Sequence, residues 1–213
     1  MNKIFLLFII TAIAFPEKIF AQRELSLKIG NEIPMGELRW VYKSAPSISI
    51  GFSVLKEKSK VNQSLGIGVG FFQFKPQEEI FYYLLNSEEY GTAQYSNYKV
   101  FQLFVPMRID FLLNEKFELF GGVDFGYYYV IYSYHTKDKV IDEEGEAIEG
   151  KGALAPKAGI NYNLSKKVGL TLQAKYNLYF SLGSSDQQSS SYNSNIGSAN
   201  HFASLQLGTY IRL

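Results

Sequence analysis

The 213-residue sequence contains no cysteine, a single tryptophan and only six prolines, and its charges nearly cancel. Without cysteine the chain can form no disulfide, no thiolate nucleophile, no cysteine metal site and no lipid-modified cysteine anchor. A formal net charge of +1, with no basic block, provides no electrostatic footprint for nucleic acid. Beyond the N-terminal segment, no apolar run is long enough for a membrane-spanning helix.

The residues that are abundant favour one β-rich domain, because the chain has 16 Tyr, 17 Phe and 18 Gly. Its first residues have the layout of an export signal, with Lys3, an apolar stretch over residues 4–15, and the small residue Ala21. This stretch is shorter than the ~20 residues that a retained anchor helix would need. We therefore predict a signal peptide over residues 1–21 and a single domain over residues 22–213.

Apolar and polar residues alternate with a period of two in eight segments, which predicts eight β-strands that are each apolar on one face. These segments are residues 24–30, 47–54, 64–71, 101–111, 117–129, 154–164, 168–180 and 203–213. Eight such strands predict a closed antiparallel barrel.

The connections between the predicted strands alternate in length. Three are short, at residues 57–62, 114–116 and 165–167, and four are long and polar, at residues 34–46, 76–97, 135–152 and 181–200. Short turns at one end and long loops at the other are typical of outer-membrane barrels, with both termini on the periplasmic side. We therefore expect an up-and-down transmembrane β-barrel in the cell outer membrane, with a soluble lipocalin-like barrel as the alternative.

Glycine indicates which face points inward. Ten of the eleven strand glycines share the polar face, and Gly121 alone lies on the apolar face. A narrow barrel interior needs such small residues to make room for long polar neighbours. The polar face is therefore predicted to line the lumen, where charges must be paired. We expect a polar network there, with Glu24 among its acids and with Lys28, Arg108, Asp110, Glu118, Asp124, Lys157, Lys175 and Arg212.

Bulky aromatic residues share the inward parity with these charges. They are Phe72, Phe120, Tyr128, Tyr132, Tyr179 and Tyr210. Because eight strands leave a lumen that side chains can fill, we expect a largely plugged barrel. On the outward face, Phe101 and Phe111 are ten residues apart, which at ~3.3 Å per residue and a tilt near 40° corresponds to about 25 Å of bilayer.

The sequence contains little that indicates catalysis. Ser133 and His135 share one parity, and Glu143, Glu144 and Glu146 follow, a set that could serve a lipid esterase. The spacing is loose, and polar residues at a strand end account for it better. The acidic segment 141–150 lacks the spaced ligands of a calcium loop, so a solvated loop is favoured over a divalent-cation site. We predict no enzyme activity, catalytic residue, cofactor or metal site.

Three segments carry a resemblance to a known family: VPMRIDFLL (105–113) with the NEK turn, FELFGGVDFGYYY (117–129), and the terminal GTYIRL. The chain resembles the eight-stranded outer-membrane barrels of the OmpA/OmpX-like type, and most closely the PorT-like barrels of Bacteroidetes-type bacteria. The resemblance implies the fold, but it carries no single activity, because members include adhesins, small-solute barrels and secretion components.

The long loops contain the remaining functional information. Phe81, Tyr82 and Tyr83 lie in the predicted loop 76–97 and are candidates for contacting a partner. We expect a monomeric structural or interaction barrel that contacts outer-membrane lipid and, through its loops, a surface or secretion-machinery protein. The alternatives are a narrow channel for small solutes or ions and a barrel associated with a secretion system.

Overall fold

The computed structural model describes residues 22–58, 61–86, 89–138, 142–181 and 201–213. The predicted signal peptide and almost all of the predicted loop 181–200 lie outside these residues. Within them, no helix is long and apolar enough to cross a membrane.

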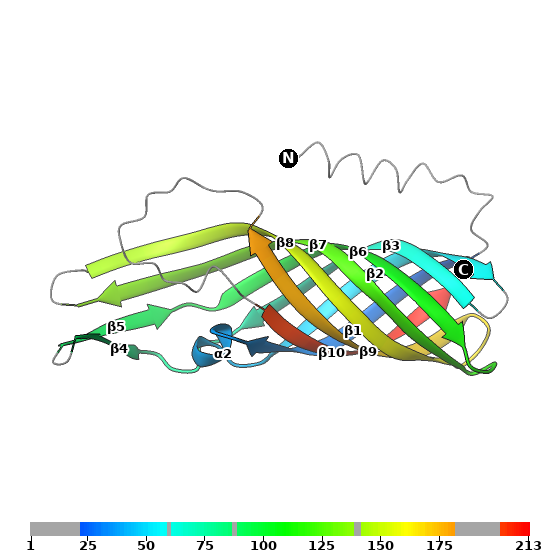
Figure 1. The fold of residues 1–213 in the computed structure, drawn as a ribbon, viewed down its shortest axis with the longest axis horizontal. Coiled ribbons are helices and arrows are strands. Elements are labelled where there is room, and N and C mark those ends of the chain that lie inside the picture. Colours follow the sequence, from blue (N-terminus) through cyan, green and yellow to red (C-terminus); the bar gives the residue numbers. More distant parts are fainter. Residues whose placement is uncertain (1–21, 59–60, 87–88, 139–141, 182–200) are drawn as a thin grey trace.

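Eight antiparallel strands form a closed barrel (Figure 1). They are β1 (Gln22–Met35), β2 (Ala45–Lys58), β3 (Val61–Phe74), β6 (Tyr98–Leu112), β7 (Phe117–Lys137), β8 (Asp142–Asn163), β9 (Val168–Ser181) and β10 (His201–Arg212). The barrel closes because β7 pairs with β8 in addition to β6, while β10 pairs with β1 and so joins the first and last strands. Each predicted strand coincides with one of these eight, so the predicted fold class is confirmed.

The barrel is apolar on its outside and polar or tightly packed on its inside. Ile29, Val69 and Leu205 on the outer face are 61%, 53% and 54% exposed, whereas the charged residues on the inner face are mostly buried. In water this arrangement would leave a continuous apolar belt unburied, whereas in a bilayer lipid covers it. The fold is therefore that of a transmembrane barrel.

Two adjacent glycines show the difference between the faces. A Cβ on Gly122, which points inward, would overlap the backbone carbonyl of Met107, whereas a Cβ on Gly121, which points outward, would meet nothing within 4 Å. The inner side of the wall is thus crowded where the outer side is open. This contrast agrees with the predicted placement of the glycines on the lumen side.

The two ends of the barrel differ, and we call them the turn end and the loop end. At the turn end, the hairpins at residues 113–116 and 164–167 are tight, and the C-terminus lies beside them (Figure 1). At the loop end, β1 and β2 are joined by a segment that contains α2 (Leu38–Val41). The predicted alternation of short turns and long connections is therefore present among the described residues.

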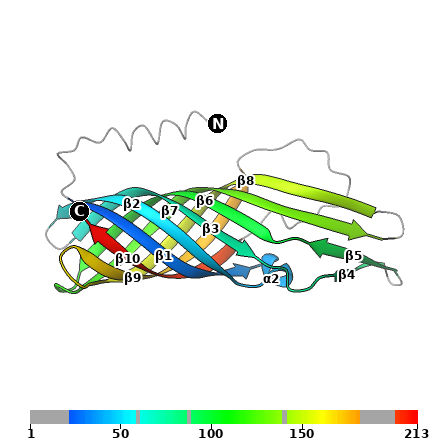
Figure 2. The same cartoon turned by 180° about the vertical axis from the view of Figure 1, so that it is seen from behind.

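Two segments predicted as loops are largely β-structure instead. Residues 76–97 contain β4 (Phe81–Asn86) and β5 (Glu89–Tyr95), and residues 135–137 and 142–152 belong to the paired far parts of β7 and β8. Strands β4, β5, β7 and β8 together make a sheet that projects beyond the barrel at the loop end (Figures 1 and 2). The loop prediction was wrong because strands outside the bilayer do not need an apolar face, so the alternation that marks the barrel strands is lost there.

Candidate functional site

The lumen near the loop end is filled by an aromatic plug, which consists of Tyr42, Phe72, Phe74, Tyr98, Tyr128, Tyr179 and Phe202. Its rings are in mutual contact: the centroids of Phe72 and Phe202 are 4.9 Å apart, and those of Tyr128 and Tyr179 are 5.3 Å apart. Edge-to-face contacts at these separations are favourable beyond the burial of area. Leu38 of α2 is fully buried against the plug and extends it toward the loop end.

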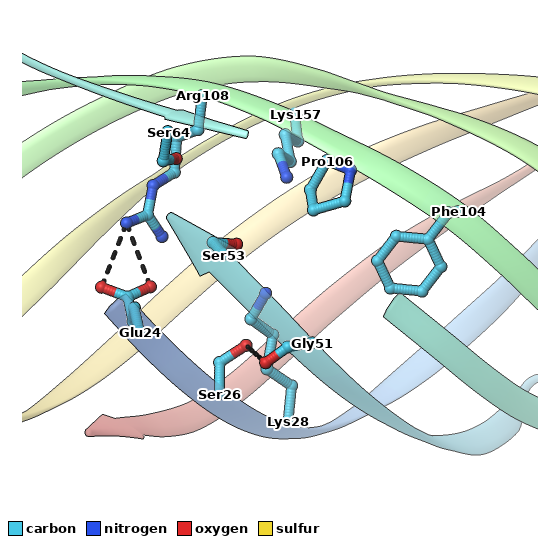
Figure 3. A pocket seen from close by; sticks show the side chains of 10 residues that line it. All are labelled: Glu24, Ser26, Lys28, Gly51, Ser53, Ser64, Phe104, Pro106, Arg108 and Lys157. Carbon is cyan, nitrogen blue, oxygen red and sulfur yellow. Dashed lines mark hydrogen bonds and ion pairs between the residues drawn. The ribbon is translucent and has the colours of Figure 1, made fainter. Parts of the chain in front are cut away.

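Below the plug, toward the turn end, the lumen contains a network of buried ions. Arg108 Nη2 is 3.1 Å from Glu24 Oε1, and Arg108 Nε is 2.9 Å from Asp110 Oδ1. Figure 3 shows the guanidinium of Arg108 directed at the Glu24 carboxylate. Arg212 Nη2 lies 2.7 Å from Glu118 Oε2, and its Nε lies 3.4 Å from Glu24 Oε2. Glu24 of β1 thus links the two arginines, which lie on β6 and β10.

A second group of ions is centred on Asp124. Its carboxylate is 2.5 Å from Lys157 Nζ and 3.5 Å from Lys175 Nζ, and all three side chains are buried. Lys28 lines the same region beside Lys157 but forms no ion pair among the described residues (Figure 3). The cavity that they line has a volume of about 10 Å³, which is room for about one water.

A chain of hydrogen-bonded polar side chains starts at Tyr128 of the aromatic plug. Tyr128 donates a hydrogen bond to Asn177 (2.9 Å), and Asn177 donates one to Ser204 (2.9 Å). Ser204 in turn donates to Glu32, which also accepts a hydrogen bond from Gln206 (3.1 Å). This chain of hydrogen bonds satisfies polar groups that burial would otherwise make costly.

The structure therefore brings eight of the nine predicted lumen charges into direct ion pairs and places Lys28 beside them. Two buried charges were not predicted from the sequence: Glu32, which is fully buried, and Lys151, whose Nζ is 2.8 Å from Glu149 Oε2. Glu32 has the same parity as Glu24 and Lys28, so the alternation already placed it on the inward face, but the first strand was predicted to end at Gly30. Lys151 was assigned to a loop.

The three aromatic residues predicted to contact a partner differ in exposure. Phe81 packs against Tyr95 with ring centroids 5.6 Å apart, and the ring of Tyr83 lies against Gly91. Tyr82, in contrast, is 72% exposed. Phe81 and Tyr83 thus stabilise the projecting sheet, and Tyr82 is the one of the three that a partner can readily reach.

The residues considered for an esterase do not form a catalytic arrangement. His135 Nε2 is 2.7 Å from Asp142 Oδ1, and the described residues contain no hydrogen bond between Ser133 Oγ and His135. The Ser133 backbone N–H is bonded to Ser96 Oγ instead (2.7 Å). Hydrogen bonds from His135 and Lys137 hold the pKa of Asp142 below its usual value. Within the described part of the chain, no group of three or more His, Asp or Glu side chains is placed to hold a metal.

No protein-family model matches the chain, and no curated protein matches it. Several solved structures are similar in fold. The attachment invasion locus protein Ail of Yersinia pestis is 14% identical, with a TM-score of 0.46 over 91% of this chain and 99% of that one. OprG of Pseudomonas aeruginosa is 11% identical, with a TM-score of 0.47 over 91% and 97%. A major outer membrane protein of Thermus thermophilus is 13% identical, with a TM-score of 0.46 over 90% and 99%.

Proposed function

We propose that this chain is an outer-membrane barrel of the structural or interaction type, with a closed lumen and a projecting sheet that contacts a surface or secretion-machinery protein. The observation that carries the proposal is the aromatic plug. Phe72, Phe74, Tyr98, Tyr128 and Phe202 are each at most 1% exposed, and this close packing within the described part of the lumen supports a closed barrel. The proposal includes the resemblance to PorT-like barrels, which rests on the sequence alone.

The orientation follows from the ends of the barrel. In outer-membrane barrels the short turns face the periplasm and the long connections face the outside. The projecting sheet of β4, β5, β7 and β8 would then stand outside the cell, where a partner has access to it. Because β4, β5, β7 and β8 are joined by backbone hydrogen bonds, the sheet presents its side chains in a defined arrangement, which lowers the entropy cost of binding.

Conductance in planar bilayers tests the closed lumen. We expect no stable conductance from the intact protein, because the plug and the ion network fill the interior. A Phe72→Ala, Phe202→Ala double variant provides a positive control, since it removes two rings in mutual contact from the plug. Steady currents from the intact protein would contradict the proposal and favour the narrow channel.

Photo-cross-linking in intact cells tests the contact with a partner. Tyr82 and Tyr90 are 72% and 68% exposed on the same face of the β4–β5 hairpin, which makes them the best positions for a photoreactive residue. Tyr127, 39% exposed on the bilayer-facing side, is the matched control. We expect a protein adduct of defined mass at Tyr82 or Tyr90 that is absent at Tyr127. Lack of an adduct at both hairpin positions would count against an interaction through this sheet.

A further inference from the structure

The outer face of the barrel contains a groove near the turn end. It has a volume of about 670 Å³, which is within the range of ligand sites. The groove is lined mainly by outward-facing apolar residues of β3, β6 and β7: Leu65, Met107, Ile109, Phe111, Gly121 and Val123.

Gly121 creates the hollow. Its cross-strand neighbour on β6 is Ile109, which is 43% exposed, yet a side chain at position 121 would meet nothing within 4 Å. The strand pairing of β3 with β6 is also interrupted beside the groove, where Pro106 has no N–H to donate. The groove therefore lies where Gly121 has no side chain while the side chains of neighbouring strands project outward.

One edge of this groove is polar, which is unusual for the belt that faces the bilayer. Lys56 and Gln63 are cross-strand partners, and Gln63 in turn is the partner of Ile109, so the three lie in one row with Gly121. Among the side chains that the structure describes, no acidic one lines the groove and none forms an ion pair with Lys56. Lys56 is two residues from the end of β2 at the turn end, so its ammonium group can reach the lipid headgroups.

We propose that this groove holds one glycerophospholipid of the periplasmic leaflet, with an acyl chain over Gly121 and the phosphate at Lys56 Nζ. The bilayer supplies this ligand at high local concentration. Arg108 also borders the groove, but its guanidinium is paired with Glu24 and Asp110 in the lumen, so Lys56 is the cation that a headgroup phosphate can meet. A second copy of the chain would bring no anion from its own groove to meet Lys56. The inference rests on the membrane insertion proposed above.

Photoreactive lipids test this proposal. The full chain is reconstituted in phosphatidylcholine vesicles that contain a trace of phosphatidylglycerol with a diazirine on one acyl chain, and the labelled peptides are mapped by mass spectrometry. We expect labelling concentrated on Met107, Ile109 and Val123. Gly121→Leu fills the hollow and should reduce this labelling to the level of the remaining outer face. Ala174→Leu, a similar change at an exposed outward position outside the groove, should leave it unchanged.

The charge of Lys56 is tested separately. Lys56→Gln should reduce the preference of the groove for phosphatidylglycerol over phosphatidylcholine by about fivefold, the effect of one lysine near an anionic lipid surface. Lys99→Gln, at an exposed outward position near the loop end, is the control. The heat-dependent shift of the folded band on a semi-native gel confirms that each variant folds.

Three results would overturn the proposal, and they are distinguishable. Even labelling of the whole outer face, unaffected by Gly121→Leu, would show that the groove holds no particular lipid. Cross-links between two copies at the groove would assign it to a protein contact. Absence of labelling anywhere on the outer face would contradict membrane insertion itself, and with it the proposed function.

Discussion

Replacing Arg108 with methionine removes the cation that neutralises two buried carboxylates, while keeping most of the side-chain volume. Glu24 retains Arg212 at 3.4 Å, but Asp110 retains only a hydrogen bond of 3.4 Å from Asn161. Asp110 is 1% exposed, so its charge would be left in the lumen without a counter-ion. Breaking a buried ion pair on one side costs about 3–5 kcal/mol, and we expect a loss of unfolding free energy in this range.

Denaturant-induced unfolding in lipid vesicles, followed by circular dichroism, measures this loss. Met107→Leu, on the same strand but on the outer face, is the control and should change stability little. Adding Asp110→Asn to the Arg108→Met variant removes the stranded charge, so most of the lost stability should return. A loss below about 1 kcal/mol for Arg108→Met, with no recovery in the double variant, would refute the reasoning and indicate that the lumen is well hydrated.

Gly122→Ala should lower the unfolding free energy by about 1–3 kcal/mol, because the added methyl group overlaps the Met107 carbonyl, whereas Gly121→Ala should be nearly neutral. Equal effects in denaturation would contradict the assignment of the two faces. At the tip of the β7–β8 hairpin, His135→Ala should raise the pKa of Asp142 toward its usual value, as measured by carboxyl NMR shifts during a pH titration. Because that pKa is depressed in the folded protein, any stability from this contact is present at neutral pH and is lost as pH falls through the folded-state pKa; an unchanged titration midpoint would contradict the contact.

The barrel wall could be predicted from the sequence because the bilayer imposes a strict alternation on every strand that crosses it. Residues 168–180, for example, alternate without a break, and β9 spans Val168–Ser181. Strand residues that extend beyond the bilayer do not need to alternate, so the acidic segment at the start of β8 has no apolar face from which a strand could be predicted. The β4–β5 hairpin could not be predicted for a different reason: Phe81 packs against Tyr95 and the ring of Tyr83 lies over Gly91, and local periodicity does not reveal such contacts.

The sequence was sufficient to predict the residues that line the lumen, but it was not sufficient to predict the ion pairs that they form with one another. Arg108 and Asp110 are two positions apart on one strand, so their contact is implied by parity alone. The contact of Arg108 with Glu24 joins positions 84 residues apart and depends on the register of every strand between them. Glu32 was missed because the end of a strand is the least certain part of its prediction.

The buried ion network also has a consequence for how the barrel closes. Because side chains alternate with a period of two, sliding one strand by two residues past its neighbour leaves every apolar residue facing the bilayer. The lipid therefore cannot distinguish the correct alignment from one that is displaced by two. The buried charges do distinguish the two alignments. Glu24 is directly opposite Arg212 where β1 pairs with β10. Displacing the pairing by two residues would separate these two side chains and leave unpaired ions in the lumen, where they are costly. The buried charges thus favour the correct alignment of β1 with β10, which the apolar outer face alone does not specify.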